Sequence, residues 1–352
     1  MSISLTSRRL VSSAAVLAGC LVCSTAHGVT MSPFTPNNPI GGGPIGWTFA
    51  GNKFVGSILD TVAQPGTNLL YSTDLTGNSV TPFGGTQVLA PTYGQEHFVA
   101  SSFGLGGFAV GDVFAASGNN IVHYSNAGVS TGNFISGSTG GIVGDVRGIM
   151  FDTVGTFGND MIVTTHAGNV YRVNSAGVPT LIASTGEDTE GADICPTNGT
   201  WGTFNGWLFV GSENSGTIRA IKPGAYTMVS VATVPSAEQV SFVPMNLGAS
   251  GSPLEGMYSA NWGVNVLKAG TSEFTGMQGD LIVTGETNST IYQLSSGNAP
   301  VSVGTFPNQP EDGIFVTADI LSADSSIPEP TSLSLLVIGT CAATLRRCRR
   351  TQ

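Results

Sequence analysis

Residues 146–184 read VRGIMFDTVGTFGNDMIVTTHAGNVYRVNSAGVPTLIAS, and this stretch decides the fold. It contains four apolar runs, each rich in β-branched and aromatic side chains, and residues such as Gly, Asn, Ser and Asp separate them. Short runs of this kind between turn-forming residues predict four antiparallel strands in one small sheet.

The same order of runs recurs on both sides of this stretch. It is complete in residues 96–137 and 190–234, and its second to fourth runs return in residues 279–306. An acidic residue opens each first strand, and these markers are Glu96, Asp145, Glu190, Glu238 and Glu311. The steps between markers are 49, 45, 48 and 73 residues, of which three match one four-stranded propeller blade. The long last step indicates an irregular blade with an insertion.

We therefore predict an all-β protein with a single β-propeller of six four-stranded blades over residues 51–321, with five or seven blades as alternatives. A β-sandwich or a solenoid is the rival architecture. The first copy, residues 68–84, lacks an opening strand, whereas residues 311–320 resemble an opening strand with nothing after it. We expect the second segment to complete the first blade, because this would close the ring and remove exposed sheet edges. Residues 29–50 are expected to form an extended lead-in.

The repeats resemble the lactonase and NHL class of propellers, in which a strand of the type Glu-Gly-aliphatic precedes one of the type aliphatic-Val-small. EGADI (190–194) and EDGIF (311–315) fit best, and EQVSF (238–242) lacks the glycine. The resemblance implies a propeller fold. It does not imply one activity, because many unrelated functions share this fold.

Composition excludes several other classes of protein. Only 10% of the 352 residues are charged, the mean hydropathy is +0.21, and the 49 glycines have no strict third-position period. A coiled coil, a disordered chain and collagen are therefore excluded. All 22 acidic residues but only six of the 12 basic ones lie within residues 29–330, which gives this part a net charge near −16. Such a charge argues against a nucleic-acid partner and favours divalent cations or neutral glycans.

The N-terminal residues 1–28 have the order of a secretory signal peptide: two arginines, an apolar stretch (10–23) and a run of small residues. We expect cleavage after Gly28. The alternative is a lipobox that would place a lipid on Cys20. After both end segments are removed, only Cys195 of the five cysteines remains, so an internal disulfide is not expected.

The C-terminus has three parts: a short stalk with Pro328-Glu329-Pro330 (322–330), an apolar segment (331–345) and a basic tail (346–352). The apolar segment would be about 22 Å long as a helix, against roughly 30 Å of hydrocarbon, so it is a marginal membrane span. The arginines of the tail would stay on the cytoplasmic side, and they are Arg346, Arg347, Arg349 and Arg350.

This order resembles the PEP-CTERM sorting signal, which exosortase enzymes are thought to recognise and remove. The resemblance implies an exosortase-type enzyme as a partner and a Gram-negative-type bacterium that produces exopolysaccharide. It also implies export through the inner membrane to the cell surface or beyond, with membrane contact only through this segment before processing. An ordinary tail anchor is the alternative.

The five acidic markers are the main candidate site. Acids at the start of the innermost strands of a propeller would surround one mouth of its channel, where they could bind calcium through carboxylate oxygens. Enzymes of the lactonase type use such an ion to polarise a carbonyl. The alternative is that each acid caps a strand or binds turn amides, with no shared site. The acidic stretch 187–193 is a second cation candidate, and a solvated loop explains it equally well.

Aromatic residues could supply stacking platforms for sugar rings, since aromatic faces suit the apolar side of a pyranose. The candidates are Trp201, Trp262 and Tyr258. The histidines at positions 97, 123 and 166 fall on different blades without metal-ligand spacing, which favours packing or surface roles over a metal site or a general base. Cys195 has no basic neighbour in sequence and is expected to be a buried packing residue.

From these observations we expect a secreted propeller of the cell envelope or extracellular matrix with a non-catalytic binding or structural role. Exopolysaccharide or envelope components would be its partners. The alternative is a calcium-dependent, lactonase-like hydrolase. The chain contains no HExxH or Walker A motif, so it lacks the standard metalloprotease and nucleotide-binding signatures.

Overall fold

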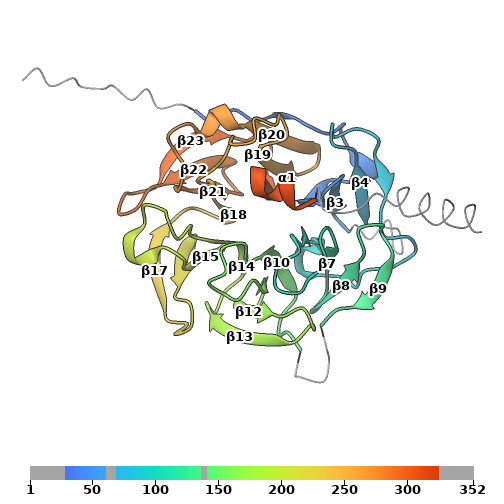
Figure 1. Ribbon diagram of the computed structural model, residues 1–352, viewed down its shortest axis with the longest axis horizontal. Helices are drawn as coiled ribbons and strands as arrows, with labels where there is room; N and C mark the ends of the chain where they lie inside the picture. The colour runs from blue at the N-terminus through green and yellow to red at the C-terminus, as the bar shows by residue number, and fades with distance from the viewer. Residues whose placement is uncertain (1–27, 61–68, 136–140, 325–352) are drawn as a thin grey trace, which may run out of the picture.

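The computed structural model describes residues 28–60, 69–135 and 141–324. Its main strands form six antiparallel sheets of four strands each, and these sheets stand as blades around a central channel (Figure 1). The predicted six-bladed propeller is confirmed, and the β-sandwich and the solenoid are excluded.

Four blades follow the order of the chain, with the first strand innermost and the fourth outermost. The first two blades are β2 (Pro44–Phe49), β3 (Phe54–Ile58), β4 (Leu70–Thr73) and β5 (Thr81–Pro82), then β6 (Val99–Ser101), β7 (Val113–Ser117), β8 (Asn120–Tyr124) and β9 (Ser130–Asn133). The next two are β10 (Val146–Phe151), β11 (Met161–Thr165), β12 (Asn169–Val173) and β13 (Pro179–Ser184), then β14 (Thr189–Ile194), β15 (Leu208–Ser212), β16 (Thr217–Ile221) and β17 (Met228–Thr233).

The last two blades are interleaved in sequence. The fifth consists of β18 (Ala237–Phe242), β21 (Leu281–Gly285), β22 (Thr290–Leu294) and β23 (Val301–Thr305). The sixth joins three separate segments: β24 (Pro310–Val316) innermost, the hairpin β19 (Gly256–Asn261) and β20 (Asn265–Gly270), and β1 (Ser32–Pro33) outermost. This hairpin is the insertion behind the long step in the repeat, and it contributes to the neighbouring blade.

The ring is closed, but the prediction that the C-terminal strand completes the first blade was wrong. The C-terminal strand β24 pairs with β19 and not with the first blade. The first blade already has an innermost strand, β2, whose six residues are all buried. Residues 29–50 are thus no simple lead-in, because they contribute β1 and β2. Both ends of the described chain therefore close the sixth blade, where blue and orange segments meet in Figure 1.

Five of the six innermost strands share an irregularity near their N-terminal ends. The ladder to the second strand shifts register at positions 44–47 of β2, 146–148 of β10, 189–192 of β14, 237–240 of β18 and 310–313 of β24. A bulge of this kind re-aims the side chains it contains. These positions include Arg147, Glu190, Glu238 and Glu311.

The hydrophobic core lies between the blades, where the faces of neighbouring sheets pack together. Phe54 of the first blade and Tyr258 of the sixth, for example, have ring centroids 4.8 Å apart. Helix α1 (Ala318–Asp324) follows β24 and lies over the channel (Figure 1). Short 3-10 helices occur at Pro39–Gly41, Tyr93–Gln95, Gly202–Phe204 and Thr271–Phe274.

Candidate functional site

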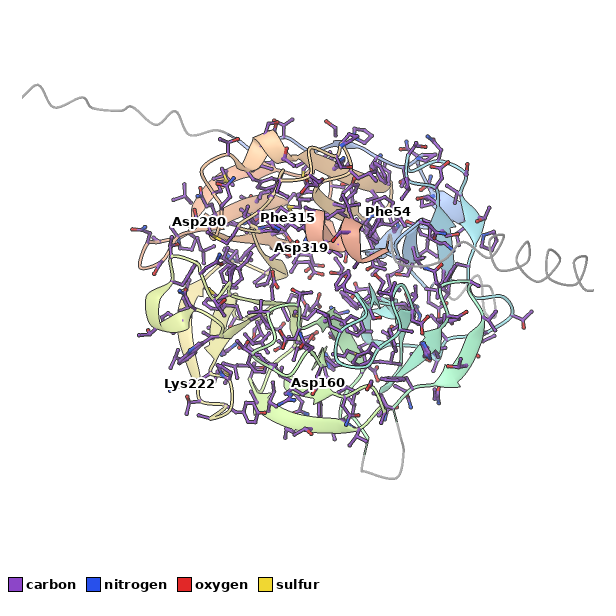
Figure 2. The ribbon with its side chains drawn as sticks, viewed as in Figure 1. Phe54, Asp160, Lys222, Asp280, Phe315 and Asp319 are labelled. Atoms are coloured by element: carbon purple, nitrogen blue, oxygen red, sulfur yellow. The ribbon has the colours of Figure 1, made fainter. Side chains whose placement is uncertain are left out.

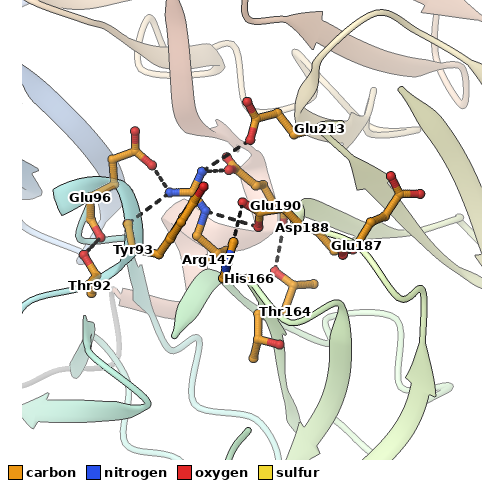
Figure 3. Close-up of polar contacts among 12 residues, drawn as sticks. Thr92, Tyr93, Glu96, Arg147, Thr164, His166, Glu187, Asp188, Glu190 and Glu213 are labelled. Carbon is orange, nitrogen blue, oxygen red and sulfur yellow. Dashed lines mark hydrogen bonds and ion pairs between the residues drawn. The ribbon is translucent and has the colours of Figure 1, made fainter. Parts of the chain in front are cut away.

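Arg147 is the centre of a polar cluster at one mouth of the channel (Figure 3). Its guanidinium forms ion pairs with Glu96 and Glu190, and its side chain is only 5% exposed. Its Nε lies 3.4 Å from Asp188 Oδ1, and Nη2 lies 3.7 Å from Glu213 Oε2. Because these acids come from the second and fourth blades, Arg147 in the third blade joins three blades.

Three further glutamates complete this cluster, which we call the acidic mouth. Glu238 lies in β18, Glu311 in β24, and Glu286 directly after β21. Gln309 Nε2 donates hydrogen bonds to Glu311, at 2.9 Å, and to Glu286. Within the described ranges none of the three glutamates forms an ion pair of its own. The acidic mouth therefore contains seven carboxyl groups and one guanidinium.

The carboxyl pKa values reflect this imbalance. Burial raises the pKa of Glu96 to about 9, with a further contribution from repulsion by Glu238. Burial is also the largest cause that raises the pKa of Glu286 to about 8 and the pKa of Glu311 well above its usual range. The pKa of Glu238 rises to about 8 for the same reason, although Arg147 opposes the rise. Either protons or an added cation must offset this negative charge at neutral pH.

A cavity of about 60 Å³ adjoins the acidic mouth inside the channel. Oxygen-bearing side chains in its wall are Glu190, Glu238, Gln239, Ser241 and Asp312. The amide Oε1 of Gln239 is buried and has no hydrogen-bond partner in the described part of the chain. Three carboxylates, an amide oxygen and a hydroxyl are hard ligands of the type that calcium prefers. The volume would hold about two waters, so the donor set and the space both fit one cation.

A second group of acids fits a metal less well. Single carboxylate oxygens of Asp188, Glu190 and Glu213 lie within 4.8 Å of one another. All three acids already face the guanidinium of Arg147, which takes the position that a cation would need. This group is therefore the binding site of the arginine.

His166 stands at the edge of the acidic mouth. It follows β11, and its Nδ1 lies 3.1 Å from Asp188 Oδ2. Its ring stacks on Tyr93, with centroids 3.4 Å apart and planes 16° from parallel. The side chain is 39% exposed, and its Nε2 contacts no partner among the described residues. A histidine whose Nδ1 faces a carboxylate and whose Nε2 is free has the geometry of a general base.

The structure brings four of the five predicted acids together. Glu96, Glu190, Glu238 and Glu311 all belong to the acidic mouth. Asp145 does not, because its side chain forms no hydrogen bond or ion pair within the described ranges. Its carbonyl accepts the backbone N–H of His166, and the channel position of β10 is taken two residues later by an arginine.

The acidic stretch 187–193 is neither one loop nor one site, because its members point to different places. Glu187 forms an ion pair with Arg219 at 2.6 Å, away from the mouth. Asp188 and Glu190 belong to the acidic mouth, whereas Asp193 lies farther along the channel.

The predicted aromatic platforms were wrong for two of three residues. Trp201 is 3% exposed and donates its indole N–H to the carbonyl of Gly279 at 2.9 Å. Tyr258 is fully buried and donates its hydroxyl to the carbonyl of Leu254. Both are core residues because their bulk fills the space between blades. Trp262 is 42% exposed, in the turn between β19 and β20.

The remaining histidines and the cysteine have packing roles, as expected. His97 is buried and its Nδ1 lies 2.8 Å from the carbonyl of Ala116. His123 lies 2.7 Å from Asp112 and stacks on Phe114. Cys195 is buried, and burial raises the pKa of its thiol to about 12. A thiol of this kind is a poor nucleophile.

Sequence reasoning missed five members of the site, among them Gln239, which follows the marker acid Glu238. Arg147 precedes Gly148 as Glu190 precedes Gly191, so aligning the opening strands on glycine could have found it. Glu213 and Glu286 each follow a second strand directly, which is a repeat position that was not compared. Asp312 follows a marker acid and gave no separate signal.

The sorting and export segments lie outside the described residues. These are the expected signal peptide, the PEP motif, the apolar segment and the basic tail. Among the residues that the structure describes, no helix has the length and apolarity needed to cross a membrane.

Comparison with known proteins supports the fold. No family model matches the chain, and no curated protein matches it. The X-ray structure of a gluconolactonase-like protein is similar, with a TM-score of 0.51 and 9% identity over 80% of this chain and 83% of the other. A streptogramin B lyase has a TM-score of 0.44 and 12% identity over 81% of this chain and 91% of the other. At such identities the first likeness shows the fold alone, and the six four-stranded sheets identify the chain as an all-β propeller.

Proposed function

We propose that this protein is a divalent-cation-dependent hydrolase of small esters or lactones, with its reaction centre at the acidic mouth. One observation carries the proposal: seven carboxyl groups face a single guanidinium beside a small cavity with an unpaired buried amide oxygen. Clusters of groups with strongly perturbed pKa values occur preferentially at functional sites.

The cation would be held by residues of the small cavity. Glu238 and Asp312 offer carboxylates, Glu190 offers the oxygen Oε2 that does not pair with Arg147, and Gln239 offers its unpaired Oε1. A bound calcium ion would supply electrostatic polarisation of a substrate carbonyl and would offset the repulsion among the glutamates. Arg147 keeps Glu190 and Glu96 in place from the opposite side.

His166 would act as the general base. Its free Nε2 accepts a proton from a water molecule as the water oxygen bonds to the carbonyl carbon. The ester or lactone C–O bond then breaks, and the imidazolium returns its proton from Nε2 to the leaving oxygen, which becomes a hydroxyl. Asp188 stabilises the imidazolium that forms, and the stacked ring of Tyr93 limits rotation of the imidazole. The name of the gluconolactonase-like neighbour supports lactones as the first substrates to test.

Two measurements test the roles of the cation and of the general base separately. Isothermal titration of the purified protein with calcium should give a single site, and Glu238→Gln should weaken binding by about tenfold or more. Asp145→Asn is the matched control, since it removes a predicted acid outside the mouth. His166→Ala should leave calcium affinity unchanged and lower lactone hydrolysis by about 10²-fold or more. Absence of calcium heat together with absence of hydrolysis would contradict the proposal.

A second candidate is a non-catalytic glycan-binding role, which Trp262 favours. The β19–β20 turn is the counterpart of the turns that carry His166, Glu213 and Glu286, so an exposed indole lies on the same face as the acidic mouth. Binding of exopolysaccharide fragments that is lost in Trp262→Ala, with no hydrolysis, would support this role instead.

We further propose that the chain is exported and sorted by an exosortase-type system. The three-part C-terminus and the N-terminal signal order support this. Mass spectrometry of the secreted protein should show an N-terminus at Val29 and loss of the arginine-rich tail in a host that has an exosortase. Retention of residues 331–352 in such a host would contradict it.

A further inference from the structure

The channel contains a second and larger cavity beyond the acidic mouth. It has a volume of about 490 Å³ and is lined by the C-terminal halves of the innermost strands, whereas the mouth lies at their N-terminal ends. Aromatic and aliphatic side chains dominate its wall, among them Trp47, Ile149, Phe151, Phe242 and Phe315. We call this cavity the apolar chamber. Its size is typical of small-molecule sites.

Helix α1 lies at the outer end of the apolar chamber. Asp319 and Ile320 of this helix belong to the lining, and Figure 2 places Phe315 and Asp319 near the centre of the ring. Asp319 Oδ2 accepts a hydrogen bond of 2.8 Å from Asn246, which fixes the helix to the loop after β18. The exposed side chain of Leu105 marks another part of the rim, so the chamber is bounded by surface loops on this face.

Two carboxyl groups face this apolar space without a cationic partner. Asp193 of β14 accepts backbone N–H bonds from Phe242 and from Ile194, both at 2.7 Å. Among the described residues, Asp312 of β24 accepts only the N–H of Gly313, at 2.8 Å on Oδ1, which leaves Oδ2 without a partner there. In the described part of the chain neither acid forms an ion pair. Burial raises the pKa of Asp193 to about 7 and that of Asp312 well above its usual range.

A third polar group in the wall also lacks a partner. Trp47 borders the chamber and is 1% exposed, and its indole N–H has no acceptor among the described residues. A chamber with unpaired carboxyl oxygen and unpaired N–H is suited to a ligand with polar atoms as well as an apolar body.

The side chains that line the apolar chamber favour an organic ammonium ion over a metal ion. A hydrated metal ion needs many oxygen donors, and the aromatic wall supplies few. An ammonium group on an apolar body can instead pair with a carboxylate while aromatic faces surround its carbon skeleton. We propose that the apolar chamber binds a small apolar amine, with its ammonium on Asp193 and its hydrocarbon part against the aromatic wall. Asp312 also borders the small cavity beside the acidic mouth, so the test is placed on Asp193, which borders the apolar chamber and not the small cavity.

The test compares two probes of equal shape, 4-phenylbutylamine and 4-phenylbutan-1-ol, by isothermal titration at pH 7.5. The amine should bind about tenfold or more tightly than the alcohol, because a hydrogen bond between charged groups is stronger than a neutral one. Asp193→Asn should remove this preference and leave the affinity of the alcohol unchanged. Asp319→Asn is the matched control, because it removes a carboxylate from the rim and leaves Asp193 intact.

Methyl NMR on the unchanged protein keeps the proposal testable if Asp193→Asn does not fold. The amine should shift the methyl resonances of Ile194 and Ile314, which line the chamber and not the small cavity at the mouth. Three results would overturn the proposal. The two probes could bind with equal affinity, or neither could bind. Alternatively, Glu238→Gln could abolish amine binding while the amine leaves the chamber methyl resonances of the unchanged protein unshifted. Calcium titration addresses the mouth separately, so failure at one site is distinguishable from failure at the other.

Discussion

The two ends of the channel are built from the same innermost strands but differ in chemistry. The acidic mouth, at the N-terminal ends, has seven carboxyl groups around Arg147. The apolar chamber, at the C-terminal halves, has an aromatic wall with Asp193 and Asp312 in it and Asp319 at its rim. The mouth coincides with the register shifts in five of these strands, whereas the chamber lies where the ladders are regular. The difference indicates that local interruptions of the ladder, repeated around the axis, place charged groups in the channel.

Removing the guanidinium of Arg147 should have the largest effect on stability among the variants of the acidic mouth. Arg147→Ala leaves Glu96, Asp188 and Glu190 buried without a counter-charge, so we expect a loss of about 3–5 kcal/mol in the free energy of unfolding. Urea unfolding at pH 7 measures it. Arg172→Ala breaks the more exposed pair with Asp160 and should lose only about 1 kcal/mol. A loss in Arg147→Ala no greater than in Arg172→Ala would contradict the central role of Arg147.

The raised carboxyl pKa values predict that stability without calcium falls as pH rises. The folded-state pKa values of Glu96, Glu238 and Glu286 lie near 8 to 9, above the ordinary value of 4.5. Their protonated forms therefore stabilise the fold fully below about pH 4.5, and this stabilisation is lost as pH rises toward 9.

Urea unfolding in a chelator should thus show a free energy of unfolding lower by about 2–4 kcal/mol at pH 8.5 than at pH 5.5. Glu238→Gln should reduce this slope, and saturating calcium should reduce it as well. A stability that stays constant or rises over this interval would show that the acids of the mouth are ionised and balanced without an added cation.

The close approach of the innermost strands can be tested at one glycine. A Cβ on Gly191 would clash with the carbonyl oxygen of Glu238 on the next blade. Gly191→Ala should therefore lower the free energy of unfolding by about 1–3 kcal/mol and weaken calcium binding, because it shifts β18 outward. Gly270→Ala, where an added Cβ meets nothing within 4 Å, is the control and should have little effect. Equal stability of the two variants would show that the strands separate without strain.

The smallest effect is expected at the predicted acid that lies outside the mouth. Asp145→Asn should change the free energy of unfolding by less than about 0.5 kcal/mol, since its side chain has no partner within the described ranges. Thermal unfolding with and without calcium measures this. A change as large as that of Glu238→Gln would extend the acidic mouth to Asp145.

Much of the architecture could be predicted from the repeat. The spacing of the marker acids predicted six four-stranded blades, and the 73-residue step predicted an insertion. The partner of the C-terminal strand could not be predicted, because β2 begins at Pro44 within a Gly- and Pro-rich segment that is typical of a loop. Its six buried residues show that packing against neighbouring blades outweighed the local preference.

The candidate site was predictable in kind but not in composition. The recurrence of glutamate predicted acids at a common mouth, and four of five positions are there. Trp201 could not be distinguished from an exposed platform, because a position near a turn does not reveal what packs over it. Tyr258 lies in strand β19, and the sequence does not show which blade packs against its side chain. Arg147 could not be recognised as the counter-charge of the acids in the mouth, since an ion-pair network across three blades depends on distances that no local sequence pattern encodes.

The amino-acid sequence alone determined that short apolar runs with a period near 47 residues must form small sheets, since only strands of that length bury such runs. It also determined that acids recur at one register of these sheets. Only the tertiary structure decided which segments share the sixth blade and that an arginine replaces one acid in the ring. It also decided that carboxyl groups line both ends of the channel. The physical reason is that these outcomes depend on contacts between residues far apart in the sequence, such as Val29 with Val303, 274 positions later, and burial energy between blades decides them.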